Sequence, residues 1–389
     1  MKIIAVNETT VPIRSSLRNA FISFDSMDVS VVAVVSDVVR DGRKVTGFGF
    51  NSNGRYSQSG LLNERFIPRM LSAEPDDYLA DDGPWPDPVR MNSVLMAGEK
   101  PGGHGDRSVA VGILDMAVWD LASKLAGVPL YEFVATRHGN GKALDRVPVY
   151  AAGGYYEPDK GLAELGDEMR GYLDLGYTNL KMKIGGTCLA GDLARIETVL
   201  ELIDDPGRLA VDANARFDLE EAAEYADALA PFGLRWFEEP GDPLDYELHR
   251  VIASVYPPPL ATGENLFSSP DARNLALYAG LRPDQDILQF DPALSYGLPE
   301  FLKTVEALAE LGWDRSRYVP HGGHQFALGI AAGLGLGGNE SYPGIFEPFG
   351  GFADGFPVED GFVALPDTPG IGLEHKSNLL PTLRQLSPD

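Results

Sequence analysis

The chain has 389 residues, of which 44% are hydrophobic, and its 32 Lys and Arg against 57 Asp and Glu give a formal net charge of −25. This acidity argues against a broad nucleic-acid interface or an anionic-membrane surface, because both need clustered cations. Cys188 is the single cysteine, which excludes an internal disulfide and a cysteine-ligated zinc site. The sequence shows neither a signal-peptide core nor a run of membrane-spanning length, so we expect a compact cytoplasmic protein.

Residues 1–140 have the pattern of a mixed α+β unit. The apolar run 31–35 and the run 45–50 are predicted to be antiparallel strands joined by the Asp41-Gly42 turn. Apolar residues then recur at helical spacing over 108–126, and Gly127 is expected to end this helix.

Residues 145–349 alternate short apolar strands with acidic amphipathic helices, which is the pattern of parallel strand pairing. Strands are predicted at 148–152, 179–184, 209–212, 235–238, 260–263, 287–290 and 318–321, with a further one at 344–347. Helices are predicted to include 161–175, 191–203, 219–230 and 299–311. Residues 350–389, rich in Gly and Pro, are expected to pack back on the N-terminal unit.

An ionisable residue closes each of six successive strands at a nearly constant interval. The intervals are 29, 26, 26, 27 and 30 residues along the series Lys183, Asp212, Glu238, Glu264, Asp291 and His321. Each interval is about the length of one βα unit, and the catalytic residues of TIM barrels lie at the C-terminal ends of several strands. An open doubly wound sheet would spread these ends along a line. A closed barrel brings them to one mouth, so the spacing favours an α/β barrel.

Asp212, Glu238 and Glu264 offer three carboxylates to a metal ion. Hard oxygen ligands suit Mg²⁺, or Mn²⁺, better than zinc or copper. Any one acid in so acidic a chain is most simply a solvated surface residue. Three acids that each end an apolar strand at equal spacing would repel one another without a cation, so we expect one Mg²⁺ per subunit here.

Lys181 and Lys183 lie two residues apart on one predicted strand and therefore point to the same face, the barrel interior. A partly desolvated cation beside a second cation has a lowered pKa, so we expect Lys183 to act as a base. Lys181 then acts with it or only orients it, and in a second interpretation both lysines merely neutralise the acidic mouth. His321 with Asp291 is the other acid/base candidate, because a carboxylate on one imidazole nitrogen fixes the tautomer.

Together these residues resemble the enolase superfamily, in its mandelate racemase/muconate lactonizing branch, whose sites use a Lys or His base with Mg²⁺. The resemblance covers essentially the whole chain and rests on Lys181-Met182-Lys183, on Asp212, Glu238 and Glu264, and on the Asp291 and His321 pair. It implies a modified TIM barrel, (β/α)7β, over 145–349. It also implies an α+β capping domain over 1–140, completed by the C-terminal segment 350–389.

Within this branch the resemblance is greatest to the D-tartrate dehydratases, through stretches such as 51–56, 99–105, 150–156 and 337–341. This resemblance implies that the substrate is bound by Asn19, Asn53, Lys100, Tyr155 and Glu340, with Tyr155 also part of the catalytic set. On the residues alone, Asn19 and Asn53 are equally well explained as turn residues and Lys100 as a solvated cation.

The implied reaction is dehydration of D-tartrate to oxaloacetate. Lys183 would remove the α-proton, the enediolate would be stabilised by the metal, and His321 would protonate the departing β-hydroxyl. A dehydratase of another aldonic or aldaric acid, or a racemase, needs the same residues, and a non-catalytic sugar-acid-binding protein is a further alternative. We expect a small hydroxy-acid substrate, no nucleic-acid or membrane partner, and a homo-oligomer.

Overall fold

The computed structural model describes residues 1–13 and 15–387. The N-terminal unit contains an antiparallel sheet in the order β1 (Ile3–Pro12), β2 (Asp28–Arg40) and β3 (Arg43–Phe50). Asp41 and Gly42 connect β2 to β3, and both have positive φ, as the favoured two-residue hairpin turn requires. The predicted antiparallel strands and their turn are confirmed.

Helices cover one side of this sheet. They are α1 (Ser59–Leu61), η1 (Leu62–Phe66), α2 (Ile67–Ser72), α3 (Pro75–Tyr78), α4 (Pro88–Leu95), α5 (Asp106–Ala126) and α6 (Leu130–His138). The long helix α5 packs against β2 and β3 and also touches the barrel, so it is apolar on most of its circumference. It ends at Gly127, whose φ of 75° suits a left-handed cap, as predicted.

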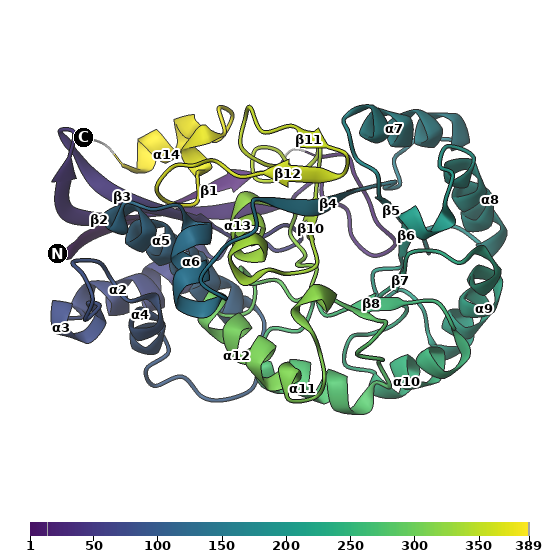
Figure 1. The fold of residues 1–389 in the computed structure, drawn as a ribbon, viewed down its shortest axis with the longest axis horizontal. Coiled ribbons are helices and arrows are strands. Elements are labelled where there is room, and N and C mark those ends of the chain that lie inside the picture. Colours follow the sequence, from purple (N-terminus) through teal and green to yellow (C-terminus); the bar gives the residue numbers. More distant parts are fainter. Residues whose placement is uncertain (14, 388–389) are drawn as a thin grey trace.

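The chain from β4 onward forms a closed parallel barrel (Figure 1). Its strands are β4 (Arg146–Gly153), β5 (Leu180–Lys183), β6 (Leu209–Asp212), β7 (Phe237–Glu238), β8 (Leu260–Thr262), β9 (Ile287–Leu288) and β10 (Asn339–Ser341), the last of which returns beside β4. Its helices are α7 (Leu162–Asp174), α8 (Leu189–Leu200), α9 (Leu219–Leu229), α10 (Tyr246–Val255), α11 (Ser269–Tyr278), α12 (Leu298–Ala309) and α13 (Gln325–Leu334). Short 3₁₀ turns lie at η2 (Pro206–Arg208), η3 (Ala230–Phe232) and η4 (Arg315–Arg317).

The segment 318–321 closes the barrel between β9 and β10. Val319 N donates to Leu288 O at 2.9 Å on one side, and Glu340 N donates to Pro320 O at 3.3 Å on the other. Pro320 has no N–H to donate, so this segment forms an isolated bridge rather than the regular strand that was predicted. With it, the described residues give eight strand positions and seven intervening helices, which confirms the (β/α)7β barrel with an N-terminal capping unit.

The strand predicted at 344–347 is wrong. The three-residue strand β10 fills that place in the barrel, whereas Gly344 and Phe346 have positive φ and lie in a turn. Ile345 and Phe346 are apolar because they pack on the core, and not because they belong to a strand. The polar sequence Asn-Glu-Ser of β10 carries no apolar strand pattern.

The barrel helices bury one face each. In α9 the buried residues are Ala222, Tyr225, Ala226 and Leu229, which is helical spacing, and Asp218 caps the helix by accepting from Glu221 N at 2.9 Å. Helix α13 differs, because it packs against both α6 and the barrel and all of its residues are buried. No helix in the described part of the chain is both long and apolar enough to span a membrane.

The C-terminal segment returns over both units. It forms β11 (Val358–Glu359), β12 (Phe362–Ala364), η5 (Leu373–His375) and α14 (Leu380–Leu386). Strand β12 pairs with β4, and α14 contacts β1 and β2, where Asn7 Nδ2 donates to Leu386 O at 2.7 Å. The division into domains at 1–140, 145–349 and 350–389 remains a prediction.

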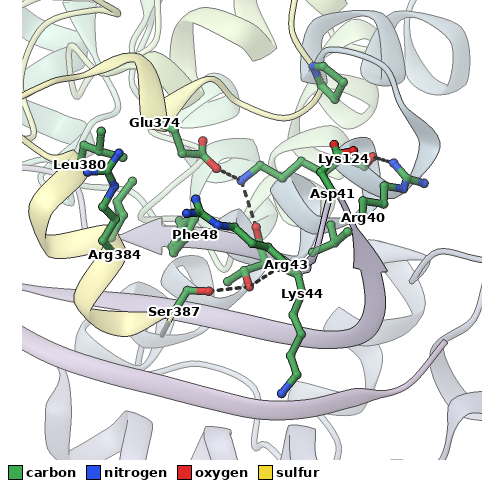
Figure 2. Close-up of a pocket in the computed structure, with 14 residues that line it drawn as sticks. Arg40, Asp41, Arg43, Lys44, Phe48, Lys124, Glu374, Leu380, Arg384 and Ser387 are labelled. Atoms are coloured by element: carbon green, nitrogen blue, oxygen red, sulfur yellow. Dashed lines mark hydrogen bonds and ion pairs between the residues drawn. The ribbon is translucent and has the colours of Figure 1, made fainter. Parts of the chain in front are cut away.

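Between the β2–β3 hairpin and α14 lies a cavity of about 810 Å³ (Figure 2). Lys124, from the last turn of α5, lines it and joins three parts of the chain. Its Nζ donates to Asp120 Oδ2 at 2.6 Å, to the carbonyl of Thr46 at 3.0 Å, and to Glu374 of η5. A partly buried lysine thus ties the C-terminal segment to the N-terminal unit.

Candidate active site

Three acidic side chains meet where consecutive barrel strands end. Asp212 ends β6, Glu238 ends β7, and Glu264 follows β8 by two residues. One carboxylate oxygen of each lies within 4.8 Å of the others, and all three side chains are buried. A donor set made only of carboxylate oxygens, at this separation, fits Mg²⁺ or Mn²⁺.

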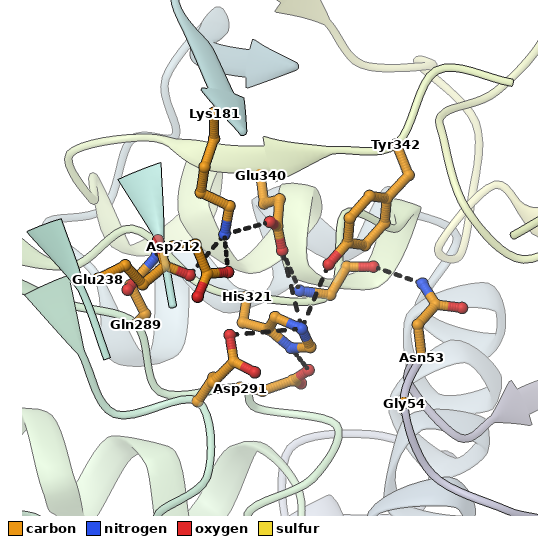
Figure 3. A network of polar contacts seen from close by, with 12 residues as sticks. Asn53, Gly54, Lys181, Asp212, Glu238, Gln289, Asp291, His321, Glu340 and Tyr342 are labelled. Atoms are coloured by element: carbon orange, nitrogen blue, oxygen red, sulfur yellow. Dashed lines mark hydrogen bonds and ion pairs between the residues drawn. The ribbon is translucent and has the colours of Figure 1, made fainter. Parts of the chain in front are cut away.

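Two lysines partly balance these acids, and Figure 3 shows one of them, Lys181, between Asp212 and Glu340. Lys181 Nζ lies 2.5 Å from Glu238 Oε1 and 2.8 Å from Glu340 Oε1, and Lys183 Nζ pairs with Asp212. The second oxygen of Glu238 accepts from Trp236 Nε1 and Gln289 Nε2, each at 2.8 Å. The barrel mouth is therefore a network of buried charges joining β5, β6, β7 and β10.

The acids of this network have widely different pKa values. Burial would raise the pKa of Asp212, but Lys183 and Lys181 outweigh it and hold that pKa below the usual range. Burial and the neighbouring Asp212 raise the pKa of Glu238 to about 8. The two lysines thus do not fully offset the effects of burial and of Asp212 on Glu238. A divalent cation among the three oxygens would favour its ionised form, which further supports the fit of a metal to this site.

The expected lowering of the lysine pKa values is wrong for this arrangement. Burial does favour the neutral form of Lys183, but the contact with Asp212 outweighs burial and raises the pKa of Lys183. Glu238 and Glu340 do the same for Lys181. Carboxylates on neighbouring strands face these two lysines, and their negative charge outweighs the mutual repulsion of the two cations.

His321 and Asp291 are brought together as expected. His321 Nδ1 lies 3.0 Å from Asp291 Oδ2, and Asp291 is fully buried. Burial would lower the pKa of His321, but Glu264, Asp291 and Glu340 raise it to about 9, so the ring is an imidazolium at neutral pH. The free nitrogen, Nε2, lies 3.3 Å from the hydroxyl of Tyr342.

The two residues after His321 must be glycines. A Cβ on Gly322 would lie 2.6 Å from Ser52 Oγ and 2.9 Å from Asp291 Oδ2, and a Cβ on Gly323 would lie 2.4 Å from the ring of Tyr342. Both also have positive φ. His324 then caps the start of α13, where its Nδ1 accepts from Ala327 N at 3.2 Å.

A cavity of about 330 Å³ opens above the carboxylates. It lies between the barrel mouth and two loops of the N-terminal unit that contribute residues from 19–24 and 53–55, here called the capping loops. The predicted site residues that line it are Lys183, Glu264, His321, Tyr155, Asn19 and Asn53. Lys183 Nζ lies 5.1 Å from the ring centroid of Tyr155, and Asn53 Nδ2 donates to Gly322 O at 3.1 Å. Asn19 is also a turn residue, because its Oδ1 accepts from Phe21 N and Ile22 N.

Two of the predicted substrate contacts do not line this cavity. Glu340 is buried beside it, held by Lys181 and by Gly322 N at 3.0 Å; burial opposes its ionisation, but Lys181 lowers its pKa to about 2. Lys100 lies on an exposed loop, where its carbonyl accepts from Arg107 Nη1 at 2.9 Å. The structure therefore places Lys100 outside the residues that surround the cavity.

Five polar residues that were not predicted as site residues also line the cavity: Arg55, Asn214, Glu239, Asn265 and Tyr342. Asn214 and Asn265 closely follow the metal-site acids Asp212 and Glu264, so reading past the strand ends would have found them. Arg55 donates to Asn265 and thereby connects a capping loop to the barrel. No comparable pattern marked Tyr342.

Comparisons with known proteins agree with this architecture. Residues 164–379 match the family described as Enolase C-terminal domain-like. The L-talarate/galactarate dehydratase of Salmonella typhimurium is 28% identical over 347 residues, covering 88% of this chain and 80% of that protein. The 3,6-anhydro-alpha-L-galactonate cycloisomerase of Streptomyces coelicolor is 32% identical over 273 residues, covering 70% of each.

Among solved structures, a racemase from Streptomyces coelicolor with bound magnesium has a TM-score of 0.79 and 23% identity, covering 99% of both chains. The resemblance first drawn from Lys181, Lys183, the three carboxylates and the Asp291 and His321 pair is thus confirmed. The chain belongs to the enolase C-terminal domain-like family, in the mandelate racemase/muconate lactonizing branch of the enolase superfamily.

Proposed function

We propose that this protein is a Mg²⁺-dependent lyase that dehydrates a small hydroxy acid, with D-tartrate as the first candidate substrate. The observation that carries the proposal is that Lys183 and His321 line the same 330 Å³ cavity together with Glu264. They come from β5 and from segment 318–321, which lie on different sides of the barrel. The Salmonella relative, a dehydratase of sugar diacids by name, supports the reaction class.

A divalent cation on Asp212 would oppose the effect by which this carboxylate raises the pKa of Lys183. In the proposed reaction the neutral Nζ of Lys183 then takes the proton from the carbon next to the substrate carboxylate. The electron pair of that C–H bond forms the new C=C bond, and the C–O bond at the β-carbon breaks. His321 gives a proton to the departing oxygen, which leaves as water, and Asp291 holds the imidazole in place. The resulting enol becomes a 2-keto acid.

Mg²⁺ held by Asp212, Glu238 and Glu264 would supply positive charge to the substrate carboxylate while the α-proton leaves. Lys181 keeps Glu238 and Glu340 in place beneath the site. Tyr155 packs under Lys183 and restricts its side chain. Asn53 presents its amide to the cavity and lets the capping unit contact substrate hydroxyls.

D-tartrate is favoured among small acids by the resemblance of the capping stretches to the D-tartrate dehydratases. The cavity is also at the small end of the usual range for ligand sites, about 300–1,000 Å³, as suits a four-carbon acid. For tartrate, Lys100 as a partner of the second carboxylate remains a prediction.

The test is an assay of the purified protein with MgCl₂ against D-, L- and meso-tartrate and a panel of aldonic and aldaric acids. We expect oxaloacetate from D-tartrate, and Lys183→Ala should lower the rate by about 10³-fold, since a positioned base contributes roughly 10²–10⁴-fold. The matched control is Lys142→Ala, at an exposed lysine. Keto acid from another acid alone would contradict the tartrate assignment, and none from any acid would contradict the dehydratase.

The second candidate function is a racemase or epimerase. It is favoured by the same placement of Lys183 and His321 on different sides of the barrel, which suits removal of a proton from one face and its return to the other. Recovery of the enantiomer or epimer, without keto acid, would establish it.

A further inference from the structure

Tyr342 occupies the position next to the proton-donating nitrogen of His321. Asp291 holds Nδ1 at 3.0 Å, so Nε2 is the nitrogen that faces the cavity side. The hydroxyl of Tyr342 lies 3.3 Å from Nε2, whereas Glu264 Oε2 and Glu340 Oε2 lie 3.8 Å and 3.9 Å away. Tyr342 also lines the cavity in which the substrate would bind. Figure 3 shows its hydroxyl directed at His321.

The ring of Tyr342 is fixed in this position. It is buried, with 2% of its surface exposed, and it packs edge-on against Phe346 with ring centroids 5.0 Å apart. On another side it lies against the backbone of Gly323, where even a Cβ would not fit. The hydroxyl therefore stays beside Nε2 of His321, and both residues line the cavity.

We propose that Tyr342 relays the proton of His321 to the departing hydroxyl of the substrate. In one concerted step the Nε2 proton passes to Tyr342 Oη, and the hydroxyl proton of Tyr342 passes to the substrate oxygen. The C–O bond breaks, its electron pair leaves on that oxygen, and water is released. Tyr342 ends the step protonated and His321 ends it neutral, so no co-reactant is needed.

This inference rests on the proposed dehydration and assigns Tyr342 to the elimination half of it. Tyr155 provides the matched comparison on the other half. It is equally buried, lines the same cavity and also packs against Phe346, at 5.7 Å, but its ring faces Lys183. Tyr155 thus lies beside Lys183, the proposed base, and Tyr342 lies beside His321, the proposed acid.

The experiment measures two rates in D₂O with MgCl₂ and the substrate identified by the acid panel. Deuterium uptake at the α-carbon of recovered substrate reports proton removal by Lys183, and keto acid formation reports the complete elimination. For Tyr342→Phe we expect keto acid formation to fall by roughly 100-fold, since positioned proton transfer contributes about 10²–10⁴-fold. Deuterium uptake should persist and KM should change less than about threefold, since the cavity keeps its shape.

Two comparisons separate a relay from a merely structural role. Tyr155→Phe should change deuterium uptake and keto acid formation together. In a substrate analogue that carries fluorine in place of the departing hydroxyl, the leaving group is fluoride, which needs no proton to depart. Tyr342→Phe should therefore eliminate fluoride at the rate of the unsubstituted protein. Thermal unfolding of each variant confirms that the fold is retained.

The relay is overturned if Tyr342→Phe retains keto acid formation within threefold, if both rates fall by one factor, or if fluoride elimination falls as much as dehydration. These results leave the proposed dehydratase standing. A protein that exchanges the α-proton but forms no keto acid would overturn the relay and the dehydration together, while leaving Lys183 as the base.

Discussion

Among the three carboxylates at the barrel mouth, Glu264 is the one for which the described structure has no ion pair with a lysine. Lys181 and Lys183 contact Glu238 and Asp212, whereas the charged group recorded beside Glu264 is His321, at 3.8 Å from Nε2. Glu264 is also the member of the three that lines the cavity. We therefore expect the negative charge of Glu264 to contribute more to binding a cation than to stabilising the fold.

We predict that Glu264→Gln weakens Mg²⁺ binding by on the order of tenfold or more, the effect typical of losing a metal-site residue. Without metal, its melting temperature should stay close to that of the unsubstituted protein, because no lysine loses its partner. Calorimetric titration with MgCl₂ and thermal unfolding measure the two quantities. Glu310→Gln, at an exposed acid, is the control, and unchanged Mg²⁺ affinity in Glu264→Gln would place the metal elsewhere.

The sequence was enough to predict which acids meet, but not how each would titrate. Asp212 and Glu238 were found because each ends an apolar strand, and parallel strands end at one edge. The pKa of Lys183 was predicted in the wrong direction because Lys183 and Asp212 are direct partners across β5 and β6, and that register is set by the closed barrel. Tyr342 and Arg55 were missed because loops, which have no periodic pattern, carry them to the cavity.

At the scale of elements, strand prediction succeeded where an apolar run had clear ends and failed where the barrel itself imposed the strand. β6 was predicted at its observed bounds, 209–212. β10 consists of polar Asn339, Glu340 and Ser341, which are buried because they complete the barrel beside β4. The tertiary position, and not the local sequence, makes this segment a strand.

Helix α10 buries an unusual residue on its inner face. His249 is fully buried, and neither ring nitrogen has a hydrogen-bond partner among the described residues. Burial lowers its pKa, and the nearby Asp242 and Asp245 offset this only in part. Below about pH 6.5 an unfolded histidine binds a proton that folded His249 does not, so the folded state loses stability as the pH falls.

We therefore predict that His249 lowers the free energy of unfolding between pH 7 and pH 5.5, by at most about 1.4 kcal/mol per pH unit. His249→Leu should remove this share of the pH dependence. Urea unfolding across this range measures it, with His375→Gln, at an exposed histidine, as the control. An unchanged slope in His249→Leu would contradict the assignment.

At the scale of the whole molecule, Lys124 joins the C-terminal segment to the N-terminal unit through Asp120 and Glu374. Burial raises the pKa of Asp120 to about 6 despite this lysine. Asp120 also accepts from Ile371 N at 2.7 Å and from Phe48 N at 2.9 Å, so it anchors both β3 and the returning chain.

We predict that Lys124→Met lowers the free energy of unfolding at pH 8 by about 3–5 kcal/mol, because Asp120 is left buried without its cation. The loss should be smaller at pH 5, where Asp120 is already protonated and needs no partner. Urea unfolding at the two pH values tests this, with the exposed Lys142→Met as the control. An equal loss at both values would show that packing of the lysine stem, and not its charge, provides the stability.

The glycines between His321 and His324 limit which changes the enzyme can accept during evolution. Any side chain at position 322 would collide with Ser52 and Asp291, and any at position 323 would push Tyr342 away from His321. The exposed loop around Lys100 has no such restriction, since a Cβ at Gly102 or Gly103 would meet open space. Lineages that acquire new substrates should therefore diverge in the capping loops while this turn remains the same.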